Sequence, residues 1–343
     1  VQFPEFVEHL GGKAVFVLDL LGDRGYLVLT EVPHRVAHQS VFVREVELHS
    51  AVYVFCHQIP CGAQALSAGH PSTYPMAFRR FLRGSVPWEQ LEGVARAVLN
   101  RYGESSGHVV FLEADNWLST PFVVEDRWFV KLITQQNSLV HALLTTGRNL
   151  GAFTAGTEGF FEHFGTPYQM AEHELEATER MREIGINAPE PVEALEIDGL
   201  GVVVLEYLPS FQALDELDRE AERRLAPDVF AALRRLHDNG LAHGDLRAEN
   251  VLITDGEVYF IDATSVNEDN RESARAYDLA CALAVLAPSV GAGEAVETAF
   301  EHYDRDDVLA AREFLDFVNI RPDHDFDATT VKGEIEKAAV ASE

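Results

Sequence analysis

The segment His243-Gly244-Asp245-Leu246-Arg247-Ala248-Glu249-Asn250 governs how this sequence of 343 residues is interpreted. It follows a stretch of helical periodicity that ends at Asn239-Gly240, and it precedes two short strands that flank Asp255-Gly256. A carboxylate in such a loop, here Asp245, accepts the proton of an attacking hydroxyl or orients a water molecule. Asn250 offers a neutral oxygen ligand suited to a hard cation such as Mg2+. The segment therefore predicts the catalytic loop of a phosphoryl-transfer site.

A second metal ligand is predicted at Asp262, which ends the strand 258–261. The two strands and the Asp255-Gly256 turn between them return the chain on itself, so Asn250 and Asp262 are expected to lie close together. An amide oxygen and a carboxylate then hold the same cation from two sides.

A cation for the nucleotide is predicted at Lys131, the only lysine between positions 13 and 332. It lies in the strand 128–133, and its placement in a lysine-poor chain suggests an anionic partner. Glu174, on the predicted helix 170–184, is positioned to pair with it. Glu172, Glu176 and Glu179 lie on the same helix, so a shift of register would exchange the partner.

The composition is strongly acidic, with 56 Asp and Glu against 27 Lys and Arg, a formal net charge of −29 and a pI near 4.7. Such a surface repels anionic membranes and disfavours direct contact with nucleic acid. The acidic, lysine-poor balance resembles that of proteins from halophiles, which keep molar salt in the cytoplasm. The sequence contains no apolar run long enough for a membrane span and no signal-peptide pattern, and its three cysteines form no disulfide framework, so we expect a cytoplasmic protein.

Three zones follow one another along the chain. Residues 1–105 alternate like β-structure, with strands at 14–18 and 25–30 and a helix at 88–101, and carry no motif that assigns a role. Residues 106–208 predict a β-rich region with one helix. Residues 209–343 predict a mainly helical region, in which 214–225 form a short helix and a new helix begins at Pro227. The expected fold class is α+β, with a small β-rich domain before the β-rich and helical lobes.

The series His-Gly-Asp-Leu followed by Asn250, and then Ile261-Asp262, resembles the RIO kinase family and the related aminoglycoside-phosphotransferase-like kinases. The segment 257–266 is most similar to RIO proteins, which lack the Asp-Phe-Gly of ordinary protein kinases. The resemblance covers about residues 109–290 and implies a two-lobed, protein-kinase-like fold that uses ATP and Mg2+.

The resemblance implies a role for each matching residue. Lys131 contacts the α- and β-phosphates with Glu174 as its helix partner, and Glu206-Tyr207-Leu208 forms the hinge that meets adenine. Asp245 becomes the catalytic aspartate, and Asn250 and Asp262 become the Mg2+ ligands. Two residues support the loop, since Asp278 braces its backbone and His243 packs beneath it.

Two features depart from the family pattern, and a third allows two interpretations. The loop expected to cover the phosphates, 114–119, contains no glycine, although glycine allows backbone donors to approach phosphate closely. Arg247 stands where RIO proteins usually carry serine, and a basic residue at that position in protein kinases neutralises the transferred phosphate. The insertion between Lys131 and Glu174 resembles the flexible segment of RIO proteins and equally suits a substrate site.

Other candidate sites favour simpler interpretations. The three cysteines, Cys56, Cys61 and Cys281, are expected to be buried small hydrophobes. His34 and His38 have ligand-like spacing but no supporting carboxylate or cysteine, so a zinc site is not predicted. The acidic group Asp323, His324, Asp325 and Asp327 lacks the glycine and glutamate of a calcium loop and predicts a solvated turn.

Three hypotheses follow. The first is an RIO-like serine/threonine kinase or ATPase that transfers phosphate from ATP to a protein hydroxyl, including its own, or to water. The second is a small-molecule kinase of the aminoglycoside or choline-kinase type. The third is a nucleotide-binding scaffold with little turnover, against which the presence of all the metal and lysine positions argues. The phosphate acceptor and the oligomeric state stay open.

The charge predicts that salt stabilises this protein. At about 1 M ionic strength the Debye length falls to about 3 Å, which screens repulsion between surface carboxylates. We expect the melting temperature to rise between 0.1 M and 2 M KCl, measured by differential scanning fluorimetry at constant pH. A melting temperature that stays constant or falls would contradict the prediction.

Overall fold

The computed structural model describes the backbone of residues 14–21 and 24–31, and residues 86–104, 107–112, 119–137, 165–263, 271–321 and 324–341. Contacts divide these residues into two compact units. The first contains the described residues up to 137 together with 166–168 and 195–207, and the second contains 165, 169–194 and 208–341.

The first unit is built on an antiparallel sheet whose strand order is β2-β1-β3-β4-β5-β7-β6. The strands are β1 (Ala14–Leu21), β2 (Arg24–Glu31), β3 (Gly107–Phe111), β4 (Thr120–Val124), β5 (Trp128–Ile133), β6 (Pro191–Ile197, whose first residues belong to the second unit) and β7 (Leu200–Glu206). Helix α3 (Trp88–Arg101) packs on this sheet because its apolar side chains, including Leu91, Val94 and Val98, recur at helical spacing and share one core with the strands.

Strand β5 lies inside the sheet, since it pairs with β4 on one side and β7 on the other. Lys131 on this strand stands opposite Pro121 and Val203 and is only 5 % exposed. A lysine at a sheet edge would keep its ammonium group in water, and a buried position inside the sheet is costly without an anionic partner.

The second unit is mainly helical. Its helices are α5 (Pro167–Glu183, whose first residues belong to the first unit), α6 (Arg219–Asp238), α7 (Arg271–Val290), α8 (Ala292–His302), α9 (Arg305–Arg312), α10 (Leu315–Ile320) and α11 (Ala328–Ala341). A small sheet of order β10-β9-β8 joins β8 (Gln212–Ala213), β9 (Val251–Thr254) and β10 (Glu257–Phe260). Two short 3-10 turns, η2 (Leu214–Glu216) and η3 (Ala248–Asn250), precede α6 and β9.

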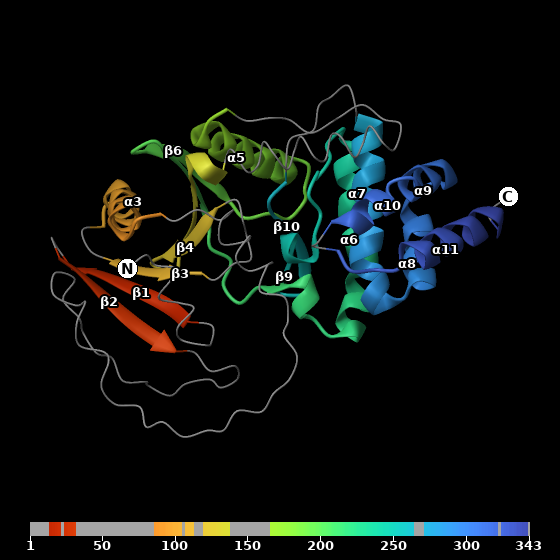
Figure 1. Cartoon of the computed structure of the whole chain (residues 1–343), viewed down its shortest axis with the longest axis horizontal. Coiled ribbons are helices and arrows are strands. Elements are labelled where there is room, and N and C mark those ends of the chain that lie inside the picture. The colour runs from red at the N-terminus through yellow and green to blue at the C-terminus, as the bar shows by residue number, and fades with distance from the viewer. Residues whose placement is uncertain are drawn as a thin grey trace, which may run out of the picture. The chain divides into compact units, whose positions relative to one another are not determined.

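Helix α7 is the centre of this unit. It contacts α6, α8, α9, α10 and α11, and Figure 1 shows it among them. Most of its residues are buried, and many are alanine, which allows neighbouring helices to approach closely. A helix that is buried on nearly all sides supplies a rigid support for polar groups that project from it.

Most elements agree with the sequence prediction, and the α+β class is confirmed, with a sheet-rich unit followed by a helical unit. One helix boundary is wrong. The sequence predicted a short helix at 214–225 and a new helix from Pro227, whereas α6 continues through Pro227 from its cap at Asp218. Proline removes one backbone hydrogen bond, but buried residues on both sides of it, such as Ala226 and Phe230, keep the helix continuous through packing.

Strand β1, from the first predicted zone, pairs with β3 of the second zone. The division into three domains and the separate role of residues 1–105 stay predictions. His34, His38, Cys56, Cys61, most of the 114–119 loop and most of the 135–170 insertion lie outside the described residues.

The structure adds physical detail to two interpretations from the sequence, those of Cys281 and of the acidic group that contains Asp327. Cys281 is buried, and burial raises its pKa to about 12, so it behaves as a packing residue. Asp327 accepts hydrogen bonds from the backbone of Thr329 and Thr330 at the start of α11, as a helix-capping carboxylate does. Among the described residues, no helix is long and apolar enough to cross a membrane.

Candidate active site

The predicted catalytic loop connects α6 to β9 in the helical unit. Gly244 has a φ of +77°, a left-handed conformation that glycine adopts without strain, and it turns the chain directly after His243. The loop then passes through η3, which ends at Asn250, and enters β9. This path places Asp245 in the turn and Asn250 at the base of the strand.

A buried carboxylate holds the start of this loop. Asp278 of α7 accepts hydrogen bonds from the backbone nitrogens of His243, at 2.6 Å, and Gly244, at 2.8 Å. His237 Nε2 lies 3.2 Å from the same carboxylate, and Tyr303 Oη lies 2.9 Å from His237 Nδ1. Because all of these groups are buried, each hydrogen bond offsets the cost of removing a polar group from water.

The carboxylate of Asp245 is held by two arginines. Arg321 Nη2 donates to Oδ1 at 2.9 Å, and Arg247 Nε lies 3.2 Å from Oδ2. Asn250 donates from Nδ2 to the Asp245 backbone oxygen at 2.8 Å, and Arg247 also pairs with Glu249. Asp245 is only 6 % exposed, so its charge depends on these partners more than on water.

The predicted metal ligands lie at the same end of the β9–β10 hairpin. Val251 pairs with Phe260, and the backbone nitrogen of Ile261 donates to the backbone oxygen of Asn250 at 3.1 Å. Asp262 follows at once with a φ of +59°, a left-handed conformation that aspartate tolerates. Since the Asn250 amide nitrogen donates within the loop, its amide oxygen is the atom that would meet a cation.

This donor set suits Mg2+. The described residues contain no group of three or more His, Cys, Asp or Glu side chains that could enclose a metal ion. Mg2+ needs no such enclosure, because it is usually bound by one or two protein oxygens together with water and substrate phosphates. Asn250 and Asp262 therefore fit a magnesium–nucleotide site better than a structural metal site.

His243 lies in the core of the helical unit, and its role as a support of the loop stays a prediction. Its ring is fully buried and stands edge-on to Phe260, with the ring centroids 5.5 Å apart. Burial lowers the pKa of His243, although the carboxylates of Asp278, Asp245 and Asp262 act in the opposite direction. The imidazole is therefore uncharged at neutral pH.

The predicted nucleotide residues are divided between the two units. Lys131 and Glu206 belong to the first unit, and Glu206 is exposed at the end of β7. Glu174 and Leu208 belong to the second, where Leu208 is buried. The pairing of Lys131 with Glu174 and the hinge role of Glu206 and Leu208 stay predictions.

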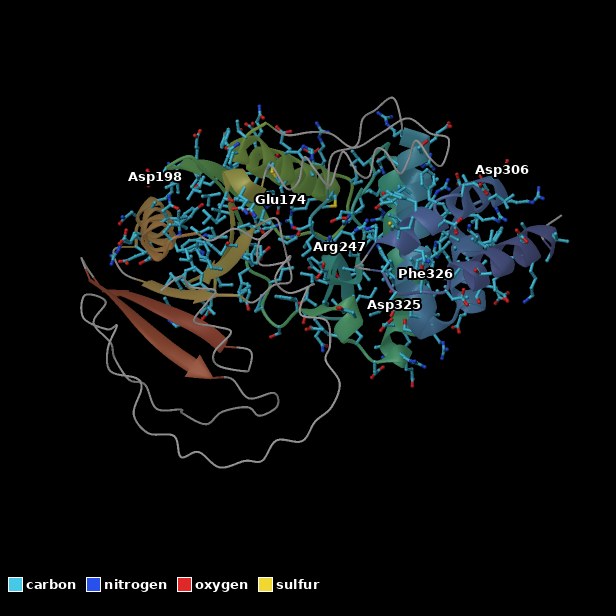
Figure 2. All side chains as sticks on the ribbon, viewed as in Figure 1. Glu174, Asp198, Arg247, Asp306, Asp325 and Phe326 are labelled. Carbon is cyan, nitrogen blue, oxygen red and sulfur yellow. The ribbon has the colours of Figure 1, made fainter. Side chains whose placement is uncertain are left out.

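The acidic residues of α5 differ in exposure. Glu174 is partly buried, whereas Glu172, Glu176 and Glu179 are exposed. Figure 2 labels Glu174 on this helix. Glu174 is therefore less accessible to water than the other three glutamates.

Sequence reasoning missed Arg321. It caps the C-terminus of the short helix α10 and reaches Asp245 across 76 positions of sequence. Neither spacing nor periodicity relates the two residues. The one available signal is the scarcity of basic residues in so acidic a chain, and that signal does not distinguish Arg321 from the other arginines.

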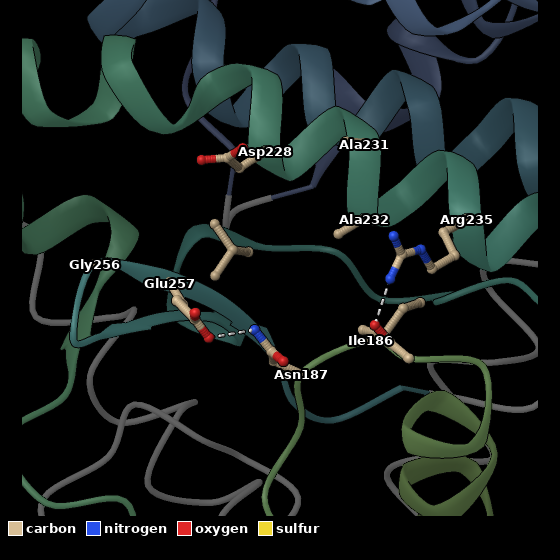
Figure 3. A pocket seen from close by; sticks show the side chains of 10 residues that line it. Ile186, Asn187, Asp228, Ala231, Ala232, Arg235, Gly256 and Glu257 are labelled. Carbon is tan, nitrogen blue, oxygen red and sulfur yellow. Dashed lines mark hydrogen bonds between the residues drawn. The ribbon is translucent and has the colours of Figure 1, made fainter.

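A cavity of about 280 Å³ lies elsewhere in the helical unit. Figure 3 shows this cavity between α6 and the β9–β10 turn. Two hydrogen bonds lie at its edge, from Arg235 to the backbone oxygen of Gly185 and from Asn187 to the carboxylate of Glu257. The structure describes all the predicted site residues, and none of them lines this cavity. It is therefore separate from the predicted transfer site.

Comparison with known proteins identifies the segment that contains the loop. The model of the RIO domain matches residues 165–281, from the start of α5 into α7. This segment of the chain is similar to the RIO domain. It includes Glu174, Asp245, Asn250, Asp262 and Asp278, whereas Lys131 and Arg321 lie outside it.

Two named relatives match about the same length of chain. One is the KEOPS complex subunit Bud32 of Pyrococcus abyssi, 31% identical over 104 residues, which are 29% of this chain and 46% of the relative. The other is the RIO-type serine/threonine-protein kinase Rio1 of Haloferax volcanii, 33% identical over 101 residues, which are 27% of this chain and 33% of the relative. The chain thus spans less than half the length of either relative.

A solved structure that overlaps this one is a mutant form of the PknI kinase domain of Mycobacterium tuberculosis. The overlap covers 67% of this chain and 93% of that domain, with 13% identity and a TM-score of 0.32. This TM-score is too low to support an argument about the RIO domain or its site.

Removing the buried Asp278 carboxylate should destabilise the RIO domain strongly. We expect Asp278→Ala to lower the free energy of unfolding by about 3–5 kcal/mol, because it leaves buried loop amides and His237 without their acceptor. Urea titration in molar KCl measures this. Asp306→Ala, on an exposed residue of α9 (Figure 2), is the control and should change stability by less than about 0.5 kcal/mol. Equal effects in the two variants would contradict the bracing role.

His243 should make stability depend on pH. Its pKa in the folded state lies below the unfolded value of about 6.5, so lowering the pH past 6.5 protonates the unfolded chain first. Above pH 6.5 the His243 imidazole is neutral in both the folded and the unfolded state, so it adds no pH dependence to the free energy of unfolding. Below it the free energy of unfolding should fall, by at most about 1.4 kcal/mol per pH unit. Urea titrations between pH 7.5 and 5.5 should show a smaller fall in His243→Asn; an identical fall would refute the prediction.

Proposed function

We propose that this chain is an ATP-dependent phosphotransferase or ATPase of RIO type. It transfers the γ-phosphate of ATP, with Mg2+, to a serine or threonine hydroxyl of a protein, its own included, or to water. The observation that carries the proposal is the braced loop, in which Asp245 and Asn250 are linked by a hydrogen bond inside a segment that is similar to the RIO domain.

The loop residues supply the chemistry of transfer. Asp245 accepts the proton of the attacking hydroxyl or orients the attacking water, and Arg247 neutralises charge on the transferred phosphate. Asn250 and Asp262 hold the metal ion, which when bound offsets the negative charge of the phosphate oxygens. His243 and Asp278 keep the loop in place and do not contact the nucleotide.

The nucleotide residues bind and orient ATP. Lys131 contacts the α- and β-phosphates, and Glu174 holds its ammonium group. The segment from Glu206 to Leu208 meets adenine. The burial of Lys131 inside its sheet supports this assignment, because a buried ammonium group needs an anionic partner such as phosphate or carboxylate.

The match to the RIO domain favours this function over the small-molecule kinase hypothesis. The acidic surface disfavours direct contact with nucleic acid, so the acceptor we propose is a protein hydroxyl or water. The pattern of cysteines supports a cytoplasmic setting, where thiols stay reduced.

ATP turnover in molar KCl tests the proposal. We expect the wild type to consume ATP when Mg2+ is present and to stop when the metal is chelated. Asp245→Ala and Asp262→Ala should lower turnover by about 100-fold or more, since each removes a group that acts during transfer. Lys131→Ala should mainly weaken nucleotide binding, measured by titration with a fluorescent ATP analogue.

Circular dichroism controls for folding in each variant. A folded wild type that neither binds nor consumes ATP would refute the proposed function. If ATP is consumed, radiolabelled γ-phosphate distinguishes the routes, because label on protein indicates a kinase and label only in free phosphate indicates an ATPase.

A further inference from the structure

The ion pair between Arg321 and Asp245 connects the C-terminal helices to the proposed transfer site. Arg321 follows directly after α10, and its Nη2 donates to Asp245 Oδ1 at 2.9 Å. The two side chains are 10% and 8% exposed. A nearly buried ion pair is screened little by water, so each charge depends on the other.

A second hydrogen bond fixes the position of the guanidinium group. Arg321 Nη1 donates to the hydroxyl of Tyr277, a fully buried residue of α7. The planar guanidinium group donates in two directions at once, which a lysine ammonium at the same place cannot do with the same geometry. Arg321 therefore bridges α7 and the carboxylate of Asp245.

Aromatic packing determines where Arg321 stands. The Tyr277 ring lies edge-on to Phe314, with centroids 6.1 Å apart, and against Phe317, at 5.8 Å. Phe314 and Phe317 belong to the N-cap and body of α10, so these contacts dock the helix that ends at Arg321 onto α7. Tyr277 thus fixes both the helix and the side chain that follows it.

The next residue of α7 is Asp278, which holds the loop backbone at His243 and Gly244. Two consecutive residues of one buried helix, Tyr277 and Asp278, therefore fix the positions of two different parts of the site. Asp278 fixes the backbone before Asp245, and Tyr277, acting through Arg321, fixes the side chain of Asp245. This arrangement fixes the position of one oxygen of the Asp245 carboxylate, Oδ1.

We propose that Arg321 is a positioning residue for phosphoryl transfer, a role that rests on the proposed function. By holding Oδ1 of Asp245, it leaves Oδ2, the oxygen 3.2 Å from Arg247 Nε, to face the phosphate acceptor. The acceptor O–H gives its proton to Oδ2, the acceptor oxygen forms a bond to the γ-phosphorus, and the bond to the β–γ bridging oxygen breaks to release ADP. The RIO domain match ends at residue 281, so Arg321 lies outside the matched segment.

Steady-state kinetics of ATP turnover in the full chain test this role. Misplacing a catalytic group by about 1 Å costs about 100-fold in rate, so we expect Arg321→Gln to lower kcat by about 10- to 100-fold. The KM for ATP should change less than threefold, because Arg321 acts on Asp245 and not on the nucleotide. Arg321→Lys should recover only part of kcat.

A matched control variant and a chemical rescue separate positioning from simple loss of structure. Lys332→Gln removes a cation that pairs with Asp316 of α10 at 2.6 Å and ties this helix to α11, and it should leave kcat within twofold. Millimolar guanidinium ion should restore part of the kcat of Arg321→Ala, because it replaces the missing group at the carboxylate. Lysozyme, assayed as an unrelated enzyme at the same guanidinium concentration, controls for nonspecific effects of the salt.

A double variant tests whether Arg321 acts through Asp245. Residues that act as a unit show losses that do not multiply, so Arg321→Gln should cause no further loss of kcat in an Asp245→Asn background. An active wild type with unchanged or increased kcat in Arg321→Gln would overturn the positioning role and leave the proposed function standing. Losses that multiply in the double variant, or an equal loss in Lys332→Gln, would also overturn it. A wild type without ATP turnover would refute the proposed function and this role together.

Discussion

The carboxylate of Asp278 is the group on which the rest of the site depends. It is fully buried, and an ionised carboxylate in that position is tolerated only when hydrogen bonds replace its water. The replacements are the amides of His243 and Gly244 and the ring of His237. The same bonds that stabilise Asp278 therefore force the loop into one conformation, and the loop geometry follows from a solvation requirement.

Helix α7 extends this solvation requirement to residues that are distant from the loop in the sequence. Its alanines bring α6, α8 and α9 close to it, so polar groups on α7 are far from water and rely on fixed protein partners. Tyr303, in the turn after α8, fixes the ring of His237, and Tyr277 fixes Arg321. Helices far along the chain from the loop thus contribute to its shape through a few buried polar contacts.

The sequence predicted the elements whose signals are local. The β9–β10 hairpin is an example, because Asp255 and Gly256 both adopt the left-handed φ that a tight hairpin turn requires. The order of Asp245, Asn250, Asp262 and Asp278 is likewise a local signal, and the structure shows that Asp278 contacts the backbone at His243 and Gly244. The continuity of α6 through Pro227 was missed because burial on both sides of the proline outweighed its local preference.

Arg321 was missed for a different reason. Its contact with Asp245 depends on how α10 packs on α7, and no residue near either partner indicates that packing. The pairing of β8 with β9 is similar, since a strand of two residues carries no periodicity. Local motifs predict the groups that are proposed to react, whereas the contacts that orient those groups come from tertiary packing.

Charge and burial together explain how such a site works in a chain with a net charge of −29. Asp245, Asp262 and Asp278 all act on His243, so three carboxylates gather around one loop. Salt at molar concentration screens charges at the surface, but it screens a buried pair such as Arg321–Asp245 much less. The salt that relieves repulsion across the surface therefore leaves the pairing inside the site intact. Stability and site geometry consequently respond to salt through different groups, and the buried arginine keeps Asp245 oriented at ionic strengths where surface ion pairs no longer hold side chains in place.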